Sequence, residues 1–317
     1  MDDSENYAIE LSFPDIAPYK KGNTGLDYAT SFDSGTPGPH VAITAVVHGN
    51  EVCGALAVDW LMREGVRPAR GKLSFLFCNV EAYRSFDPAN PQASRFVDED
   101  FNRVWAAETL DGPRKSAELA RARAIRPFLD TVDLLLDIHS MQHPTAPLML
   151  CGPLEKGRRF ARELGTPEIV VSDAGHSAGK RMRDYGGFGD PKSAKNALLV
   201  ECGQHWEKMS EPVAKQTALR FLLATGAVSR DWIEPRLTPP PASQKIVEVT
   251  HPITIKSDDF AFYEPYKGLE TIPKAGTVIA RDGAAHVTTP YDRCVLIMPS
   301  RRLGKGQTAV RLGRYVA

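Results

Sequence analysis

The 317-residue sequence lacks several features that would assign it to a class at once. Its 39 basic and 39 acidic residues cancel, so its charge gives no reason to expect binding to nucleic acid or to an anionic membrane surface. No apolar run approaches the roughly 20 residues of a membrane span, and the acidic residues 1–6 lack the apolar core of a secretory signal. The five cysteines are scattered without a Cys-x-x-Cys pair, which argues against a disulfide framework and a cysteine-based zinc site. These absences predict a cytoplasmic protein with reduced thiols.

The first two thirds of the sequence alternate strand-like and helix-like segments. Apolar runs typical of buried strands occur at residues 41–47, 73–78, 132–138, 168–171 and 197–200. Segments with helical composition or periodicity lie at residues 55–62, 113–129, 154–164 and after residue 210. This alternation predicts an α/β fold, in which a mainly parallel or mixed sheet carries helices on both faces.

The pattern changes at residues 234–243, where four prolines predict a stiff linker. Beyond it, residues 245–250, 276–280 and 292–298 have the composition of short strands, and no helix is expected. The predicted organisation is a domain of residues 1–233, a linker of residues 234–243 and a small all-β domain of residues 244–317.

Three side chains at the ends of predicted strands have the chemistry of zinc ligands. Residues 48–54 (His-Gly-Asn-Glu-Val-Cys-Gly) follow the first strand and place His48 and Glu51 at a strand-to-helix turn, while His139 directly follows the third strand. Catalytic zinc usually takes three protein ligands, and open α/β sheets carry their chemistry at strand ends. We therefore predict one zinc ion per chain, with Asp137 orienting His139. The alternative for the first pair is a structural turn in which Glu51 begins the helix and complements its dipole.

Two further groups of polar residues can complete a hydrolytic site. Glu201 ends the apolar strand at residues 197–200, where burial would raise its pKa toward that of a general base, unless it simply emerges into solvent. Residues 95–103 (Arg-Phe-Val-Asp-Glu-Asp-Phe-Asn-Arg) place two arginines around three acids and an amide. An arginine binds a carboxylate through two hydrogen bonds, and a neighbouring asparagine can add a donor. Taken alone, such a charge run would be a solvated loop.

Four motifs occur in the order and at the approximate spacings of a known family. They are His-Gly-Asn-Glu-x-x-Gly, Asp-x-Asn-Arg, Asp-x-His and Glu-x-Gly, at residues 48–54, 100–103, 137–139 and 201–203. Over roughly residues 40–205 the sequence resembles the aspartoacylase and succinylglutamate desuccinylase family, a branch of the zinc carboxypeptidase superfamily. The C-terminal β domain also looks like that of this family.

The resemblance implies roles for the residues that match the motifs. His48, Glu51 and His139 would hold the zinc. Glu201 would be the general base and proton shuttle, and Arg95 would polarise the scissile carbonyl. The implied chemistry is hydrolysis of an amide by water.

The resemblance also implies contacts with the substrate. Arg103, with Asn102, would bind the carboxylate of an N-acyl amino acid, and Asp100 would support this loop. A tyrosine of the C-terminal domain would approach the substrate, and the register assigns either Phe262 or Tyr263 to that position, of which we take Tyr263. A further family arginine has no clear match, and the basic residues near its expected place are Lys192, Lys195, Arg181 and Arg183.

The implied function is a zinc-dependent hydrolase that removes the acyl group from a small N-acyl amino acid. Two alternatives stay open: a metallocarboxypeptidase acting on peptides, and a non-catalytic protein that binds a small molecule or a metal. The sequence leaves the acyl group, the amino acid and the oligomeric state open, a homo-oligomer included.

Residues 183–190 form a glycine-rich segment beside the last motif. Its three glycines permit unusual backbone angles, and Tyr185 and Phe188 could cover a ligand, so the segment is a candidate lid. The alternative is a plain flexible connector.

Overall fold

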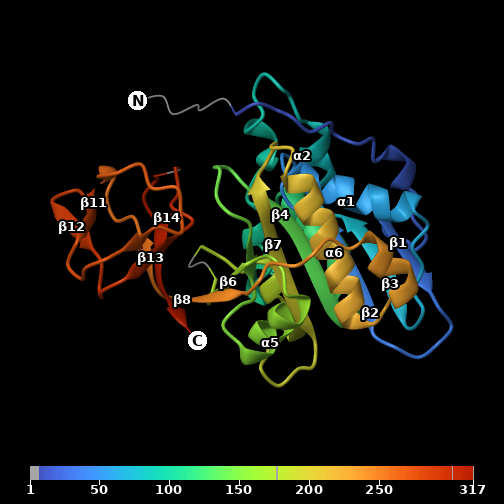
Figure 1. Cartoon of the computed structure of the whole chain (residues 1–317). Coiled ribbons are helices and arrows are strands. Elements are labelled where there is room, and N and C mark those ends of the chain that lie inside the picture. Colours follow the sequence, from blue (N-terminus) through green and yellow to red (C-terminus); the bar gives the residue numbers. More distant parts are fainter. Residues whose placement is uncertain (1–6, 176–177, 302, 317) are drawn as a thin grey trace.

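An eleven-stranded mixed sheet runs through the computed structural model, which describes residues 7–175, 178–301 and 303–316 (Figure 1). From edge to edge its strands are β1 (Ala29–Asp33), β3 (Lys72–Phe77), β2 (His40–Ala45), β4 (Leu134–Met141), β7 (Asn196–Gln204), β5 (Leu148–Leu150), β6 (Ile169–Ser172), β8 (Lys245–Thr254), β14 (Thr308–Val316), β13 (Cys294–Ile297) and β10 (Thr271–Ile272). A separate sheet contains β12 (Ala285–Thr288), β11 (Val278–Asp282) and β9 (Phe260–Phe262).

The centre of the large sheet is parallel. Strands β3, β2, β4 and β7 run in the same direction, whereas β1 and β5 are antiparallel to their neighbours β3 and β7. The predicted mixed α/β sheet is therefore confirmed. Two strands are longer than predicted, so His139 and Glu201 lie within β4 and β7 rather than after them.

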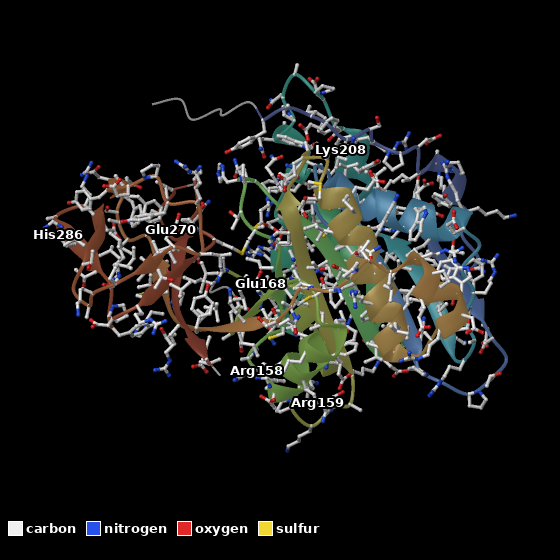
Figure 2. All side chains as sticks on the ribbon, viewed as in Figure 1. Arg158, Arg159, Glu168, Lys208, Glu270 and His286 are labelled. Atoms are coloured by element: carbon white, nitrogen blue, oxygen red, sulfur yellow. The ribbon has the colours of Figure 1, made fainter. Side chains whose placement is uncertain are left out.

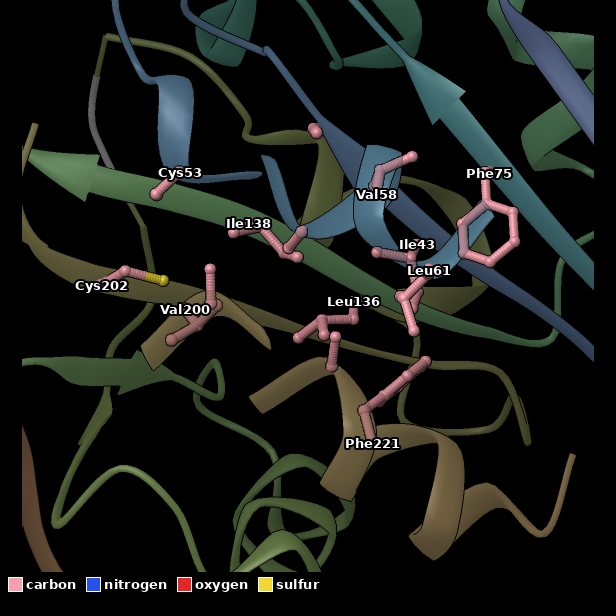
Figure 3. Packing of buried hydrophobic residues seen from close by; sticks show 14 of the residues in the cluster. Ile43, Cys53, Val58, Leu61, Phe75, Leu136, Ile138, Val200, Cys202 and Phe221 are labelled. Carbon is pink, nitrogen blue, oxygen red and sulfur yellow. The ribbon is translucent and has the colours of Figure 1, made fainter. Parts of the chain in front are cut away.

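Helices cover both faces of this sheet, as predicted. The longer ones are α1 (Val52–Arg63), α4 (Ala117–Leu129), α5 (Glu155–Leu164) and α6 (Ser210–Thr225), and the short ones are α2 (Val80–Arg84), α3 (Ala107–Leu110) and α7 (Arg230–Ile233). Helices α1 and α6 pack on one face, where Leu61 and Phe221 meet Leu136 and Val200 of the strands (Figure 3). Helix α4 packs on the other face through side chains such as Leu119. Each large apolar side chain buried in these layers contributes about 1.5–3 kcal/mol.

The described helices include none long and apolar enough to cross a membrane.

The pleat of β4 and β7 separates the core from the polar side chains. Leu136, Ile138 and Val200 point into the cluster beneath α1 and α6. Successive side chains of a strand point to opposite faces, so His139 and Glu201 project from the other face. The two residues are direct partners in the parallel register of β4 and β7. The sheet therefore brings His139 and Glu201 side by side near the carboxyl-terminal ends of these two strands.

The C-terminal strands continue the large sheet. Strand β8 pairs in parallel with β6 and antiparallel with β14, and β11–β14 lie to one side of β4 and β7 (Figure 1). After residue 244, all regular secondary structure in the described part of the chain is β-strand. The proline-rich segment of residues 234–243 begins with a 3₁₀ turn, Glu234–Arg236. The segment is hydrogen-bonded to Gln216 and Arg220 of α6. The exact domain boundaries stay a prediction.

Two smaller expectations have opposite outcomes. All five cysteines are free and buried, in agreement with the prediction of no disulfide framework. The lid interpretation of residues 183–190 is wrong, because Tyr185 and Phe188 are buried in the core beside α4. The Tyr185 ring contacts Trp105, and its hydroxyl donates to Asp130 Oδ1 at 2.7 Å. These aromatic side chains fill the fold and are not available to cover a ligand.

Candidate active site

A tight turn after β2 positions the first two candidate ligands. A Cβ at Gly49 would lie 2.3 Å from Ser94 O, so only glycine fits this approach. The Gly49 N–H donates to Arg95 O at 3.1 Å, which ties the turn to the loop that carries Arg95. His48 and Glu51 are both buried, and Glu51 is the N-cap residue directly before α1, with no capping hydrogen bond from its side chain. The Glu51 carboxylate is therefore not used to cap the helix and faces the candidate metal site.

The ligand atoms of three side chains converge. His48 Nδ1 lies 2.6 Å from Glu51 Oε1, and His139 Nδ1 lies 2.9 Å from Glu51 Oε2. One ligand atom from each residue lies within 4.8 Å of the others. The second nitrogen of His139, Nε2, lies 2.8 Å from Asp137 Oδ2, as predicted, and Asp137 Oδ1 accepts from Thr44 Oγ1 at 2.7 Å. This arrangement turns Nδ1 of His139 toward the site and can hold one metal ion.

The charges of the cluster suit a metal ligand set. Burial opposes the negative charge of Glu51, but positive charge on His48 and His139 holds its pKa well below the usual value of a carboxyl. Glu51 is therefore an anion, the form that binds a cation. Two imidazoles and a carboxylate are a donor set typical of zinc.

Glu201 has the properties expected of a general base. Its side chain is buried beside His139, its register partner. Within the described part of the chain, no group hydrogen-bonds its Oε2 atom. Burial raises the pKa of Glu201 to about 8, and the neighbouring carboxylate of Glu51 acts in the same direction. A carboxyl group with such a pKa can both accept and return a proton near neutral pH.

Arg95 lies against the candidate metal ligands. Its Nη2 atom is 3.0 Å from His48 Nε2 and 3.1 Å from Asp100 Oδ2, and its Nη1 atom is 3.4 Å from Glu51 Oε1. Burial disfavours its charge, but Asp100 and Glu51 outweigh this and raise its pKa. Arg95 is therefore a fixed cation beside the place where a metal would bind.

Asn102 and Arg103 lie in the 3₁₀ turn Phe101–Arg103 and face the same cavity. Asn102 Oδ1 accepts from Met182 N at 2.8 Å, which leaves the amide N–H groups as its donors toward a ligand. Arg103 Nη1 donates to Asn102 O at 2.8 Å, and its Nη2 atom is 4.0 Å from Asp100 Oδ2. Burial lowers the pKa of Arg103. Arg103 is thus a partly buried guanidinium with a distant carboxylate neighbour.

A cavity of about 670 Å³ joins these residues to the C-terminal strands. Its wall after residue 244 includes Lys267, Arg301 and Arg311 but no described acidic residue. Arg311 of β14 is buried, and its Nε atom lies 3.3 Å from Asp173 Oδ2. The C-terminal part therefore adds positive charge to the cavity, which the four sequence motifs gave no means to predict.

Four basic residues were candidates for the further family arginine that has no clear match in the sequence. Of the four candidates, Arg181 alone is among the described residues of the cavity wall. Its guanidinium is bound to Asp173 and Asp184. Arg183 donates to main-chain oxygens in the core, and Lys195 Nζ donates to Asp130 O. Of the four candidates, Arg181 is therefore the one that can contribute positive charge to the described cavity wall.

Tyr263 does not reach the cavity, contrary to the expectation that it contacts the substrate. Its side chain is 52% exposed, and its hydroxyl lies 3.5 Å from His286 Nδ1. His286 lies at the end of the C-terminal part that is far from the large sheet's helices (Figure 2). Phe262, the other register, packs against Tyr266. Both belong to the β9 region of the separate sheet, which holds them away from the described wall of the cavity.

Comparisons with known proteins agree with the motif order and the fold. Residues 37–225 match the family model described as the succinylglutamate desuccinylase/aspartoacylase catalytic domain. The chain is 31% identical to the aspartoacylase of Xenopus tropicalis over 124 residues, which span 36% of this chain and 38% of that protein. A succinylglutamate desuccinylase structure from Vibrio cholerae matches with a TM-score of 0.66 at 19% identity, over 91% of this chain and 86% of that chain. A succinylglutamate desuccinylase/aspartoacylase structure from Rhodobacter sphaeroides matches with a TM-score of 0.61 at 17% identity, over 89% and 86%.

Proposed function

Since this chain belongs to the succinylglutamate desuccinylase/aspartoacylase family, we propose that it is a zinc-dependent hydrolase that removes the acyl group from an N-acyl amino acid. One observation carries the proposal: the ligand atoms of His48, Glu51 and His139 converge within 4.8 Å beside the buried carboxyl group of Glu201.

His48, Glu51 and His139 would hold the zinc ion. Zinc supplies two effects when it is bound in such a site: it lowers the pKa of water to about 7, and it withdraws electrons from a carbonyl group. Asp137 holds Nε2 of the His139 ring, so that Nδ1 would be the nitrogen that binds the ion. The Glu51 carboxylate is already held as an anion, whereas any proton on the ligating nitrogens of His48 and His139 would be released on binding.

Glu201 would carry the proton through the reaction. Its carboxylate takes a proton from the attacking water and later gives it to the nitrogen of the leaving amino acid. The raised pKa of Glu201 supports both steps, and positive charge from a bound metal would bring that pKa down toward neutrality. Its position as register partner of His139 sets it beside the proposed metal site.

Arg95 would stabilise the charge that develops on the acyl oxygen. Its guanidinium is buried beside His48 and is kept charged by Asp100 and Glu51. Fixed donors aimed at a developing oxyanion are usually the largest contribution to catalysis in acyl transfer.

Arg103 and Asn102 would bind the free carboxylate of the amino acid. Arg103 offers a partly buried fork of donors, and Asn102, which also lines the cavity, keeps its amide N–H groups as donors. Lys267, Arg301 and Arg311 make the far wall positive as well. A cavity with this charge favours an anionic substrate over a neutral amide.

A metallocarboxypeptidase is the second candidate, because the same constellation would cleave peptides. The C-terminal strands form part of the cavity wall, and this favours a small substrate over an extended chain. The test is a panel of N-acyl amino acids and of peptides, incubated with zinc-loaded protein. We expect release of free amino acid from the first set only.

Metal content provides the matched control. His48→Ala should lose bound zinc, whereas His251→Ala, at an exposed position of β8, should retain it. Peptide cleavage would favour the second candidate. Equal zinc content in His48→Ala would refute the ligand assignment, and absence of zinc from wild-type protein would support a non-catalytic role.

A further inference from the structure

The acidic residues of the 95–103 segment, hereafter the arginine loop, do not act together. Asp100 faces His48 and Arg95 in the candidate active site. Asp98 and Glu99 instead contact the first turn of α4. The charge run that the proposed function leaves unexplained thus divides into one site residue and two residues bound to a helix.

A buried glutamate at the start of α4 holds the main chain of this loop. The side chain of Glu118 is fully buried, and its Oε1 atom accepts from Val97 N at 2.7 Å. Its Oε2 atom accepts from Asp98 N at 3.0 Å and from Glu99 N at 3.2 Å. Asn79 Nδ2 supplies a fourth donor, to Oε1 at 3.0 Å. A buried carboxylate is costly unless it is hydrogen-bonded, and four donors satisfy this one.

The loop in turn caps the helix. Asp98 Oδ2 accepts from Ala117 N at 2.7 Å, and Glu99 Oε1 accepts from Ser116 Oγ at 2.5 Å. Ser116 Oγ also accepts from Leu119 N at 3.0 Å, which caps α4. The helix and the loop are therefore joined by hydrogen bonds in both directions.

We infer that Glu118 is a positioning residue for the proposed reaction. It fixes residues 97–99, which lie between the proposed oxyanion donor Arg95 and the proposed carboxylate-binding pair Asn102 and Arg103. Glu118 is not among the described residues that line the cavity, so it acts through the loop and not on the substrate. The inference rests on the proposed function for the roles of the two arginines, whereas the contacts between Glu118 and the loop do not.

The test is Glu118→Gln. Glutamine replaces one of the two accepting oxygens of Glu118 with an NH₂ group, which is a donor. Whichever way the amide is turned, this NH₂ group faces a main-chain N–H donor of the loop. We expect kcat/KM of the zinc-loaded enzyme to fall about 100-fold, since a displacement near 1 Å of catalytic groups has effects of this size. Both kcat and KM should worsen, because Arg95 and Arg103 shift together. Glu108→Gln, the same change at an exposed position of α3, should leave both parameters unchanged.

Amide hydrogen exchange gives a readout independent of activity. The N–H groups of residues 97–99 should exchange slowly in wild-type protein and faster in Glu118→Gln, with zinc content unchanged. If Glu118→Gln fails to fold, Ser116→Ala is the substitute variant. It removes the hydrogen bond to Glu99 and the helix cap, and it should increase the exchange of residues 97–99 and lower kcat/KM by a smaller factor.

The possible failures are distinguishable. If wild-type protein hydrolyses no N-acyl amino acid, the proposed function fails while the exchange measurement still tests the contacts. Unchanged exchange at residues 97–99 in the folded variants would overturn the inference. A lower unfolding midpoint with unchanged kcat and KM would overturn it as well, because that result would mean a structural role only.

Discussion

Replacing Arg103 with methionine should remove recognition of the substrate carboxylate while leaving the metal site intact. Arg103 lines the cavity, and its one described carboxylate partner, Asp100 Oδ2, is 4.0 Å away. Burial already disfavours its charge, as the lowered pKa shows. A substrate carboxylate would therefore meet a partly buried cation that has no closer carboxylate partner among the described residues.

The size of the effect follows from these contacts. A hydrogen bond to a charged group contributes about 1.5–3 kcal/mol, and the Arg103 fork has room for one or two of them. Their loss should cost about 2–4 kcal/mol, which corresponds to about 30- to 900-fold in kcat/KM. Methionine keeps much of the apolar stem, so packing should change little.

The assay compares the best N-acyl amino acid of the panel with its carboxamide, which lacks the negative charge. Wild-type protein should prefer the carboxylate by the factor above, and Arg103→Met should lose that preference. Arg63→Met, on the exposed side of α1, is the matched control and should behave as wild type. Equal losses on both substrates in Arg103→Met would refute the reasoning, as would a wild-type enzyme that accepts both equally.

Three further substitutions test other parts of the structure. Asp137→Ala should weaken zinc binding about 10- to 100-fold, measured by competition with a chelator, because His139 loses the partner that orients it. Burial opposes the charge of Asp173, but Arg181 lowers the pKa of the carboxyl group. The charged carboxylate therefore stabilises the fold fully above the ordinary carboxyl pKa, and this stabilisation is lost as the pH falls through the lowered pKa. Asp173→Asn should consequently make the free energy of unfolding less dependent on pH between 5 and 3. Phe221→Ala should lower the free energy of unfolding by about 3–5 kcal/mol in denaturant titrations, because its ring is fully buried beneath α6.

Each of these three has its own contradicting outcome. Unchanged zinc affinity in Asp137→Ala would argue against orientation of His139 by Asp137. An identical pH dependence in Asp173→Asn and wild type would show that the Asp173 ion pair does not contribute. A loss below 1 kcal/mol in Phe221→Ala would mean that the core beneath α6 is loosely packed.

Local sequence pattern was enough to predict the central strands and to single out the candidate metal ligands, whose side chains the structure brings together. Buried parallel strands are continuous apolar runs, so β2, β3, β4 and β7 were recognisable, and polar residues at their ends were conspicuous. The three-residue strand β5 was too short for any periodicity. The residues His139 and Glu201 were correctly grouped, although both lie within their strands and not after them.

Features that depend on tertiary packing were not predictable in the same way. Arg311 reaches the cavity only because β14 pairs with β8 within the large sheet. The sequence pattern predicted no strand around Tyr263, and it gave no means to predict β9 or the separate sheet that contains it. Glu118 looked like an ordinary residue of an Ala-, Arg- and Glu-rich helix, and only its burial against the arginine loop distinguishes it.

The most direct test of the proposed deacylase is single-turnover hydrolysis of an N-acyl amino acid by zinc-loaded wild-type and Glu201→Gln protein. Glutamine keeps the shape of Glu201 but cannot accept and return the proton. We predict equal zinc content and a rate reduced about 10²- to 10⁴-fold in the variant. Hydrolysis at the wild-type rate by zinc-loaded Glu201→Gln, or no hydrolysis of any N-acyl amino acid by zinc-loaded wild type, would contradict the proposal.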